Sequence, residues 1–157
     1  MNAGKALVDQ AHWLLHEIEV QSTDSCTGLR IVLADDSSDM RQLLKGILEN
    51  MGAEIIGEAV NGQQAITMAA QYRPDIICLD VEMPIVSGID ALAKIHASHP
   101  SIKAVMVANR ADLNTAVRAI TLGACGYILK PYKPDQLEAA LCKVIRYKRK
   151  QLLVART

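Results

Sequence analysis

The sequence predicts an α/β fold, in which a parallel β-sheet carries helices on both of its faces. Five short apolar runs alternate along the chain with segments whose apolar residues recur every three or four positions. The runs lack the polar alternation of a strand with one face in water, so both of their faces should be buried. Half of the residues are hydrophobic, which is enough for a substantial core.

Five segments are predicted to be strands, because each is a short apolar run bounded by turn-forming or helix-capping residues. In chain order they are Leu29–Ala34, Glu54–Val60, Asp75–Leu79, Ala104–Ala108 and Tyr127–Leu129. Pro74 ends the segment before the third strand, and Pro100 breaks the chain before the fourth.

The five helices that follow these strands are predicted from apolar stripes at helical spacing. In chain order the stripes are Met40, Leu43, Leu44, Ile47, Leu48 and Met51; Ala65, Ile66 and Ala69; Ile89, Leu92 and Ile95; Leu113, Val117 and Ile120; and Leu137, Leu141, Val144 and Ile145. Ser37 and Asp112 suit the starts of two helices, whereas Gly52 and Gly123 end them. Pro134 suits the first turn of the last helix. These amphipathic helices are expected to cover the sheet.

The alternation of strands and helices restricts the order of the strands in the sheet. Right-handed crossovers between parallel strands leave few topologies. We expect the flavodoxin-like order 2-1-3-4-5, a standard solution for a doubly wound five-stranded sheet. In such sheets the functional crevice lies at the carboxyl ends of the strands.

The domain itself should span residues 29–146, with an extension at each end. Residues 1–28 are predicted to form a helix and a polar linker. The apolar stripe of that helix is expected to pack on the domain or on a second copy, so a homodimer is one expected assembly. Residues 147–157 form a basic tail that should extend the last helix and leaves no room for a DNA-binding output domain. Nucleic acid is not an expected partner.

Composition narrows the function classes. The chain has 17 basic and 17 acidic residues, so no general attraction to nucleic acid or anionic membrane is implied. No apolar stretch approaches the ~18 residues of a membrane span, and no signal peptide is recognisable, which favours a cytoplasmic protein. The four cysteines lack metal-ligand spacing, and Cys78 is expected to be a buried core residue.

Acidic residues follow two strands that the expected topology makes neighbours. Asp35 and Asp36 come directly after the first strand, and Asp80 follows the third. Three carboxylates at one edge of a sheet repel one another unless a cation neutralises them. Their oxygen ligands favour a hard ion, and Mg²⁺ is the usual one. Lys130, at the end of the fifth strand, offers a positive charge to a phosphate oxygen.

These residue types suit phosphoryl transfer. The carboxylate of Asp80 can act as the nucleophile toward an activated phosphoryl group. The metal ion and Lys130 would neutralise the charge on the phosphoryl oxygens. The alternative is that the acids only cap helices, which could hold for Asp35 alone but accounts poorly for the four residues together.

Several motifs resemble the response-regulator receiver domains of two-component signalling, including the chemotaxis regulators. They are Leu33-Ala34-Asp35-Asp36-Ser37, Leu79-Asp80-Val81-Glu82-Met83-Pro84, Ser87-Gly88 and Gly123-Ala124-Cys125-Gly126-Tyr127-Ile128-Leu129-Lys130-Pro131-Tyr132. The resemblance runs from about Leu29 to Arg146. It implies a phosphoacceptor at Asp80 and a Mg²⁺ ion held by Asp36, Asp80 and the backbone carbonyl of Glu82, with Asp35 acting through water. It also implies that Tyr127 is the switch aromatic, which turns inward on activation.

One position departs from the family pattern. The family has Ser or Thr at the end of the fourth strand, where this chain has Ala108. The following position, usually small, is Asn109. The missing hydroxyl would bond a phosphoryl oxygen, and its loss should weaken the switch by about 1.5–3 kcal/mol, or roughly ten- to a hundredfold.

The leading hypothesis is a non-enzymatic receiver that takes phosphate from a histidine kinase or phosphotransfer protein and signals to a downstream protein. A second hypothesis is a pseudo-receiver, a binding module that works without phosphorylation, which Ala108 and Asn109 would suit. A third is a phosphatase with an aspartyl-phosphate intermediate. Such enzymes need a second Asp two residues after the nucleophile, and this chain has Glu82 there.

Overall fold

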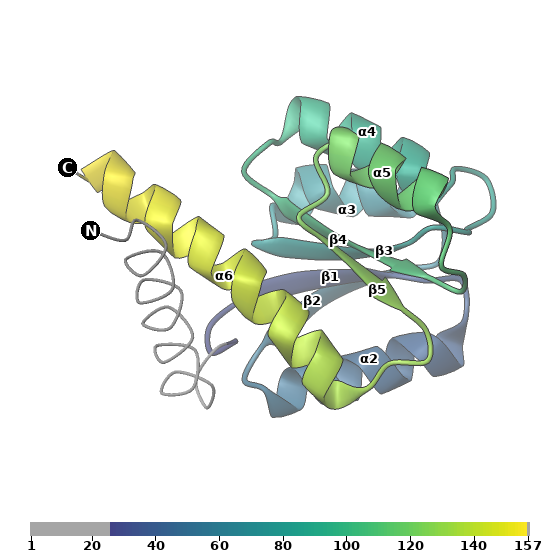
Figure 1. Ribbon diagram of the computed structural model, residues 1–157, viewed down its shortest axis with the longest axis horizontal. Helices are drawn as coiled ribbons and strands as arrows, with labels where there is room; N and C mark the ends of the chain where they lie inside the picture. The colour runs from purple at the N-terminus through teal and green to yellow at the C-terminus, as the bar shows by residue number, and fades with distance from the viewer. Residues whose placement is uncertain (1–25, 157) are drawn as a thin grey trace, which may run out of the picture.

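The computed structural model describes residues 26–156, with side chains through Ile145, so the helix predicted near the N-terminus lies outside the described residues. The elements, in chain order, are β1 (Arg30–Ala34), α2 (Ser38–Asn50), β2 (Glu54–Ala59), α3 (Gly62–Tyr72), β3 (Ile76–Asp80), α4 (Gly88–Ser98), β4 (Lys103–Ala108), α5 (Leu113–Thr121), β5 (Gly126–Leu129) and α6 (Pro134–Arg156). Strands and helices alternate as predicted (Figure 1).

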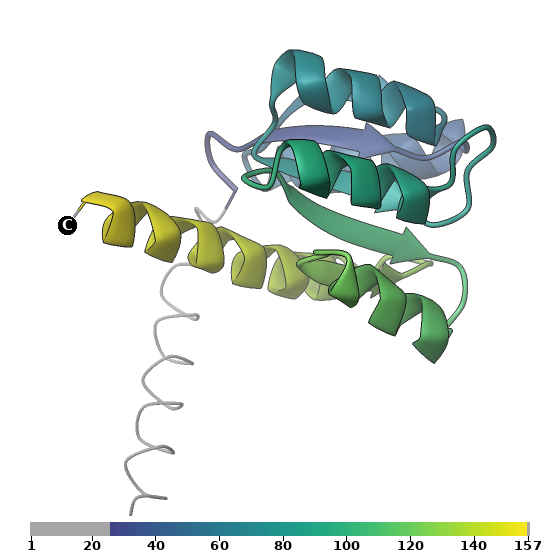
Figure 2. The ribbon, with the colours of Figure 1, turned by 90° about the horizontal axis from the view of Figure 1, so that it is seen from above.

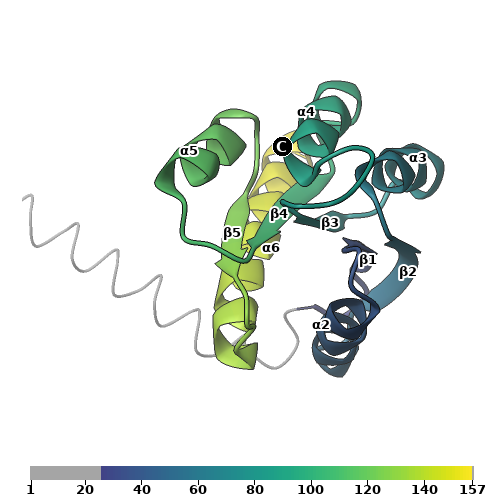
Figure 3. The same ribbon diagram turned by 90° about the vertical axis from the view of Figure 1, so that its right-hand side faces the viewer.

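The five strands form one parallel sheet in the order β2-β1-β3-β4-β5, which confirms the predicted flavodoxin-like topology. Helices α2 and α6 lie on one face, and α3, α4 and α5 lie on the other (Figures 1 and 3). The three central strands β1, β3 and β4 are almost entirely buried, because both of their faces are covered.

Alternation along each strand divides the buried side chains between two cores. On β1, Ile31 and Leu33 point to the core under α2 and α6, whereas Val32 points to the core under α3 and α4. Cys78, as expected, is a buried core residue at 1% exposure, and burial raises the pKa of its thiol to about 12. The thiol therefore stays protonated and packs as a small apolar group.

The predicted ends of the helices agree with the structure at most positions. Ser37 and Asp112 are the N-caps of α2 and α5, and Pro134 is the first residue of α6. The predicted boundary of the third strand is off by one residue, because Asp80 is the last residue of β3 and not the first residue after it. This difference matters, since Asp80 is paired in the sheet with Val107 of β4 and is held more rigidly than a loop residue would be.

The prediction that the apolar stripe of α5 covers the sheet is wrong. Leu113, Val117 and Ile120 are 77%, 54% and 62% exposed, and the helix contacts the core through Ala119. Helix α5 lies at the β5 edge of the sheet (Figure 3), so only a narrow strip of its surface meets the core. The spacing of apolar residues predicts an amphipathic helix but cannot say which of its sides a neighbour covers.

Helix α6 is longer than the sheet it covers, and it continues past the sheet edge to Arg156 (Figure 2). Its first half packs on the domain as predicted, with Leu137, Leu141, Val144 and Ile145 buried. Within residues 26–156 we find no helix with both the length and the apolar character needed to cross a membrane.

Gly88, the first residue of α4, allows this helix to begin against the end of β3. A Cβ atom at Gly88 would lie 1.9 Å from the carbonyl oxygen of Asp80, which is a severe clash. It would also lie 3.0 Å from the Cα of Val81. These are backbone atoms, so they cannot move aside without displacing the end of β3 that carries Asp80. The Gly88 amide also donates to the Val81 carbonyl at 3.0 Å and fixes the same turn.

We therefore expect Gly88→Ala to lower the free energy of unfolding by about 3 kcal/mol, measured by urea denaturation. Gly46→Ala is the matched control, because nothing lies within 4 Å of the new methyl group in the middle of α2. That change should raise stability by about 0.5–1 kcal/mol. Equal effects of the two substitutions would contradict the close approach at Gly88.

Candidate functional site

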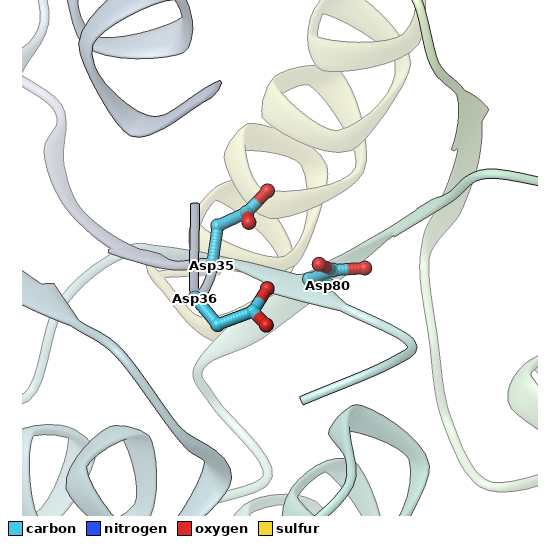
Figure 4. A group of neighbouring side chains, drawn as sticks. All are labelled: Asp35, Asp36 and Asp80. Carbon is cyan, nitrogen blue, oxygen red and sulfur yellow. The ribbon is translucent and has the colours of Figure 1, made fainter. Parts of the chain in front are cut away.

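Three carboxylates meet at the carboxyl edge of the sheet. Asp35 follows β1, Asp36 comes next, and Asp80 ends β3, the neighbour of β1. One carboxylate oxygen from each lies within 4.8 Å of the others, and Figure 4 shows Asp36 extending toward Asp80. Asp35 and Asp80 are buried, whereas Asp36 is exposed. The predicted convergence of these residues is therefore confirmed.

Strand alternation explains why the site residues share one face. Leu33, Cys78 and Ile128 belong to the core under α2 and α6, and each precedes a site residue by two positions. Asp35, Asp80 and Lys130 consequently extend the same rows of side chains beyond that core. The site therefore lies at the carboxyl ends of the strands, where the apolar core under α2 and α6 gives way to polar side chains.

Lys130 joins the two buried carboxylates. Its Nζ lies 2.7 Å from Oδ2 of Asp35 and 3.2 Å from Oδ2 of Asp80. The contact with Asp80 is also a hydrogen bond in which the ammonium group donates. Burial alone would lower the pKa of Lys130, but the hydrogen bond with Asp35 and the charges of Asp80 and Asp35 raise it above its usual value. Lys130 therefore remains charged in the site.

One positive charge does not balance the carboxylates. Burial, and after it the charge of Asp35, raises the pKa of Asp80 to about 6, against the opposing effect of Lys130. Additional positive charge near Asp80 would stabilise its anionic form and lower this raised pKa. The site accordingly has the charge and the oxygen donors that suit a hard divalent cation such as Mg²⁺.

Backbone and side-chain contacts hold the segment that carries Asp35 and Asp36. The amide of Ser37 donates to Oδ1 of Asp35 at 2.9 Å. Nη1 of Arg41 donates to the Asp35 carbonyl at 2.6 Å, while its Nε forms an ion pair with Glu58 of β2 at 3.4 Å. Sequence reasoning missed Arg41. Its spacing, four residues after the capping Ser37, could have placed it on the same side of α2 as the loop.

The loop after β3 forms the other wall. The amide of Glu82 donates to Oδ1 of Asp80 at 3.3 Å, and the amide of Gly62 on α3 donates to the Val86 carbonyl at 3.0 Å. Ile85 has a positive φ of 71°, and the Val86 amide donates to the Pro84 carbonyl across it at 2.8 Å. This is a γ-turn, a strained conformation for a β-branched residue, which the contacts on either side hold in place.

An open cavity of about 670 Å³ lies between these walls. Most of the predicted site residues line it, namely Asp35, Asp36, Asp80, Glu82, Asn109 and Lys130. Ala108 is buried at the end of β4, where it pairs with Leu129, and does not line the cavity. The side chain at the cavity beyond β4 is therefore that of Asn109.

Tyr127 lies away from the carboxylates. It pairs with Met106 in the sheet and packs, half-buried, against the core under α3 and α4, the opposite face from Asp80. The structure does not bring it into contact with the acidic cluster. Tyr127 is linked to the site through its own strand, which leads to Lys130, and through its pairing with β4.

Comparison with known proteins points to one family. Residues 31–142 match the response regulator receiver domain. The chain is 36% identical to the chemotaxis protein CheY of Thermotoga maritima over 117 residues, which are 74% of this chain and 98% of that protein. It is also 36% identical to a protein-glutamate methylesterase/protein-glutamine glutaminase of Haloarcula marismortui, over 74% of this chain but only 32% of that protein. The crystal structure of a CheY-like receiver domain protein from Methanospirillum hungatei covers 78% of this chain and 98% of its own, with a TM-score of 0.73 and 26% identity.

Proposed function

Since the chain belongs to the response regulator receiver domain family, we propose that it takes a phosphoryl group on Asp80 and transmits a signal through protein contacts. The observation that carries the proposal is the placement of Asp80. It is a buried carboxylate at the floor of an open cavity, within 3.2 Å of the ammonium group of Lys130 and beside two further carboxylates. The alternative role of these acids, the capping of helices, does not require that they cluster around a lysine.

The residues present fit a Mg²⁺ ion. Asp36 and Asp80 would hold it directly and Asp35 through water, together with the backbone carbonyl of Glu82, and all of these are oxygen donors. When bound, the ion would neutralise charge on the carboxylates and on the phosphoryl oxygens. The raised pKa of Asp80 supports this assignment, because a cation would favour the anionic form that the reaction needs.

The chain's own residues account for the transfer. A carboxylate oxygen of Asp80 attacks the phosphorus atom, a new O–P bond forms, and the bond between phosphorus and the donor breaks. With phosphohistidine as donor, the bond broken is P–N and the imidazole leaves with its electron pair. Lys130 stabilises the negative charge on the phosphoryl oxygens, and the sheet pairing of Asp80 with Val107 keeps the nucleophile in line.

The donor that we propose is a histidine kinase or a histidine phosphotransfer protein, and the output is contact with a downstream protein. We also propose that the receiver spans residues 29–146, that the segments at 1–28 and 147–157 are extensions, and that the protein acts in the cytoplasm. A homodimer formed through the N-terminal segment stays a prediction, which sedimentation of the full chain and of a chain starting at residue 26 would test.

A pseudo-receiver is the second candidate, and Ala108 favours it because a hydroxyl is missing where the family uses one. Intact-mass measurement after incubation with phosphoramidate and Mg²⁺ separates the two. A receiver should gain the mass of one phosphoryl group, and the gain should disappear with excess EDTA. An unchanged mass under conditions that label another receiver would favour the pseudo-receiver.

We expect Ala108→Thr to strengthen the response of Tyr127 to the site. The added hydroxyl can bond a phosphoryl oxygen and pull the loop after β4 inward, which should shift the two-state equilibrium by about tenfold or more. The readout is the NMR signal of Tyr127 with and without beryllofluoride, a mimic of the phosphoryl group.

Asn109 is the rival cause of weak coupling, because its side chain lines the cavity. The double change Ala108→Thr with Asn109→Ala separates the two effects. If the wild type already switches fully, or if neither variant changes the response, the hydroxyl is dispensable in this protein.

A further inference from the structure

Tyr132 has a buried hydroxyl group with no hydrogen-bond partner. The residue is only 8% exposed and follows Lys130 by two positions. A phenylalanine would fill the same apolar space without burying a polar atom, so packing alone does not explain the hydroxyl. Sequence reasoning did not single out this residue beyond its place in the Lys130-Pro131-Tyr132 motif.

Tyr132 packs in the core that borders the acidic cluster. It belongs to the same core as Leu33, Cys78 and Ile128, the residues one step below Asp35, Asp80 and Lys130 on their strands. Burial, and then the negative charges of Asp35 and Asp80, raise the pKa of the Tyr132 hydroxyl. The hydroxyl therefore keeps its proton and can act as a donor.

The Tyr132 hydroxyl differs from the other buried polar atoms near the site. In the part of the chain that the structure describes, three buried side-chain atoms have no hydrogen bond other than an ion pair, namely Asp35 Oδ2, Arg41 Nε and the Tyr132 hydroxyl. Asp35 Oδ2 is ion-paired with Lys130, and Arg41 Nε is ion-paired with Glu58. Of these three atoms the Tyr132 hydroxyl alone has neither kind of partner, and the carboxylate whose charge acts on it most is that of Asp35.

In the structure the Nζ of Lys130 is the ion-pair partner of Asp35 Oδ2, at 2.7 Å. A phosphoryl group on Asp80 would add oxygens that compete for the same ammonium group, which already reaches Asp80 at 3.2 Å. When Lys130 turns to a phosphoryl oxygen, Asp35 Oδ2 needs another donor, because an unsatisfied buried carboxylate oxygen is unfavourable.

We propose that Tyr132 is a positioning residue of the phosphoacceptor site, whose buried hydroxyl donates a hydrogen bond to Asp35 once Lys130 has moved to the phosphoryl group. This inference rests on the proposed function of Asp80. The Tyr132 hydroxyl is expected to destabilise the free protein and to stabilise the protein that carries a phosphoryl group or its mimic. The hydroxyl is unsatisfied in the free protein and satisfied in the loaded protein, so it favours the loaded state.

Tyr132→Phe tests the proposal, because it removes the hydroxyl and keeps the ring. The variant should melt at the same temperature as the wild type or higher without ligands. It should bind beryllofluoride in the presence of Mg²⁺ about tenfold more weakly, as expected for the loss of a hydrogen bond to a charged group. Tyr72→Phe, at a partly exposed tyrosine of α3, is the control and should leave both quantities unchanged.

A second comparison tests whether the hydroxyl acts through Asp35. In an Asp35→Asn background, the charge that strengthens the hydrogen bond is gone, so Tyr132→Phe should weaken beryllofluoride binding by about threefold or less. An undiminished tenfold loss in that background would show that Tyr132 acts on some other group.

The remaining outcomes are distinct. If the wild type and Tyr132→Phe bind beryllofluoride equally well, the proposal for Tyr132 is wrong and the proposed function stands. A variant that is destabilised equally with and without the ligands would show a purely structural role and would also overturn the proposal. If neither protein binds beryllofluoride with Mg²⁺, the proposed function fails and the role of Tyr132 fails with it.

Discussion

Asp80→Asn should abolish the mass increase that the wild-type protein shows after incubation with phosphoramidate and Mg²⁺. The amide is a far weaker nucleophile than the carboxylate, and Asp80 is a buried carboxylate that contacts Lys130 and lines the cavity. Asp90→Asn, at an exposed acid in the first turn of α4, is the matched control and should label like the wild type. Full labelling of the Asp80 variant would mean that the phosphoacceptor is another residue.

The pH dependence of the free energy of unfolding gives a second test of Asp80→Asn and shows whether the variant is folded. The pKa of Asp80 is raised from 3.8 to about 6, mainly by burial and then by the charge of Asp35. Its ionisation therefore destabilises the metal-free wild type as the pH rises from about 4 through 6. Asp80→Asn has no such group, so it should be more stable than the wild type at pH 7. The difference should shrink as the pH falls toward 4, which urea denaturation at several pH values would measure.

Asp36→Ala should reduce the affinity for Mg²⁺ by about tenfold or more, because it removes one of the few carboxylates available to the ion. Asp36 is exposed and contributes little to packing, so the fold should tolerate the change. Titration with Mg²⁺ or Mn²⁺, followed by NMR signals around Asp80, gives the measurement.

Asp39→Ala is the control for the metal experiment. Asp39 is an exposed acid three residues further on, in the first turn of α2, and it does not line the cavity. Loss of one surface charge there should change the affinity for Mg²⁺ only slightly, and less at higher salt. If Asp36→Ala binds Mg²⁺ as tightly as the Asp39 variant does, the ion is held elsewhere.

Much of this arrangement follows from sequence pattern, because it depends on contacts that any parallel sheet of this topology must make. Apolar runs without polar alternation have to be buried on both faces, and right-handed crossovers then bring the ends of β1 and β3 together. The acids at the ends of these two strands are placed side by side by the backbone alone. Their convergence could therefore be predicted before any side chain was seen, whereas their chemical roles stay predictions.

Tertiary structure alone decided the features that depend on which neighbour a side chain meets. The stripe Leu113, Val117 and Ile120 is equally amphipathic whether it faces the sheet or the solvent, and only the edge position of α5 decides that it is exposed. The family pattern assigns the switch position to Ala108, and the structure adds that the next side chain, Asn109, lines the cavity.

The sequence by itself determined the fold, the edge of the sheet that carries the site and which charged residues lie there. These features depend on the periodicity of apolar residues and on the order of the strands. The anchoring of Asp35 by Arg41 and the burial of the Tyr132 hydroxyl were decided only in three dimensions. Both depend on how closely neighbouring elements pack, because a change of a few tenths of an ångström decides whether two groups form a hydrogen bond. Sequence periodicity specifies the face on which a residue lies, and packing specifies what that residue touches.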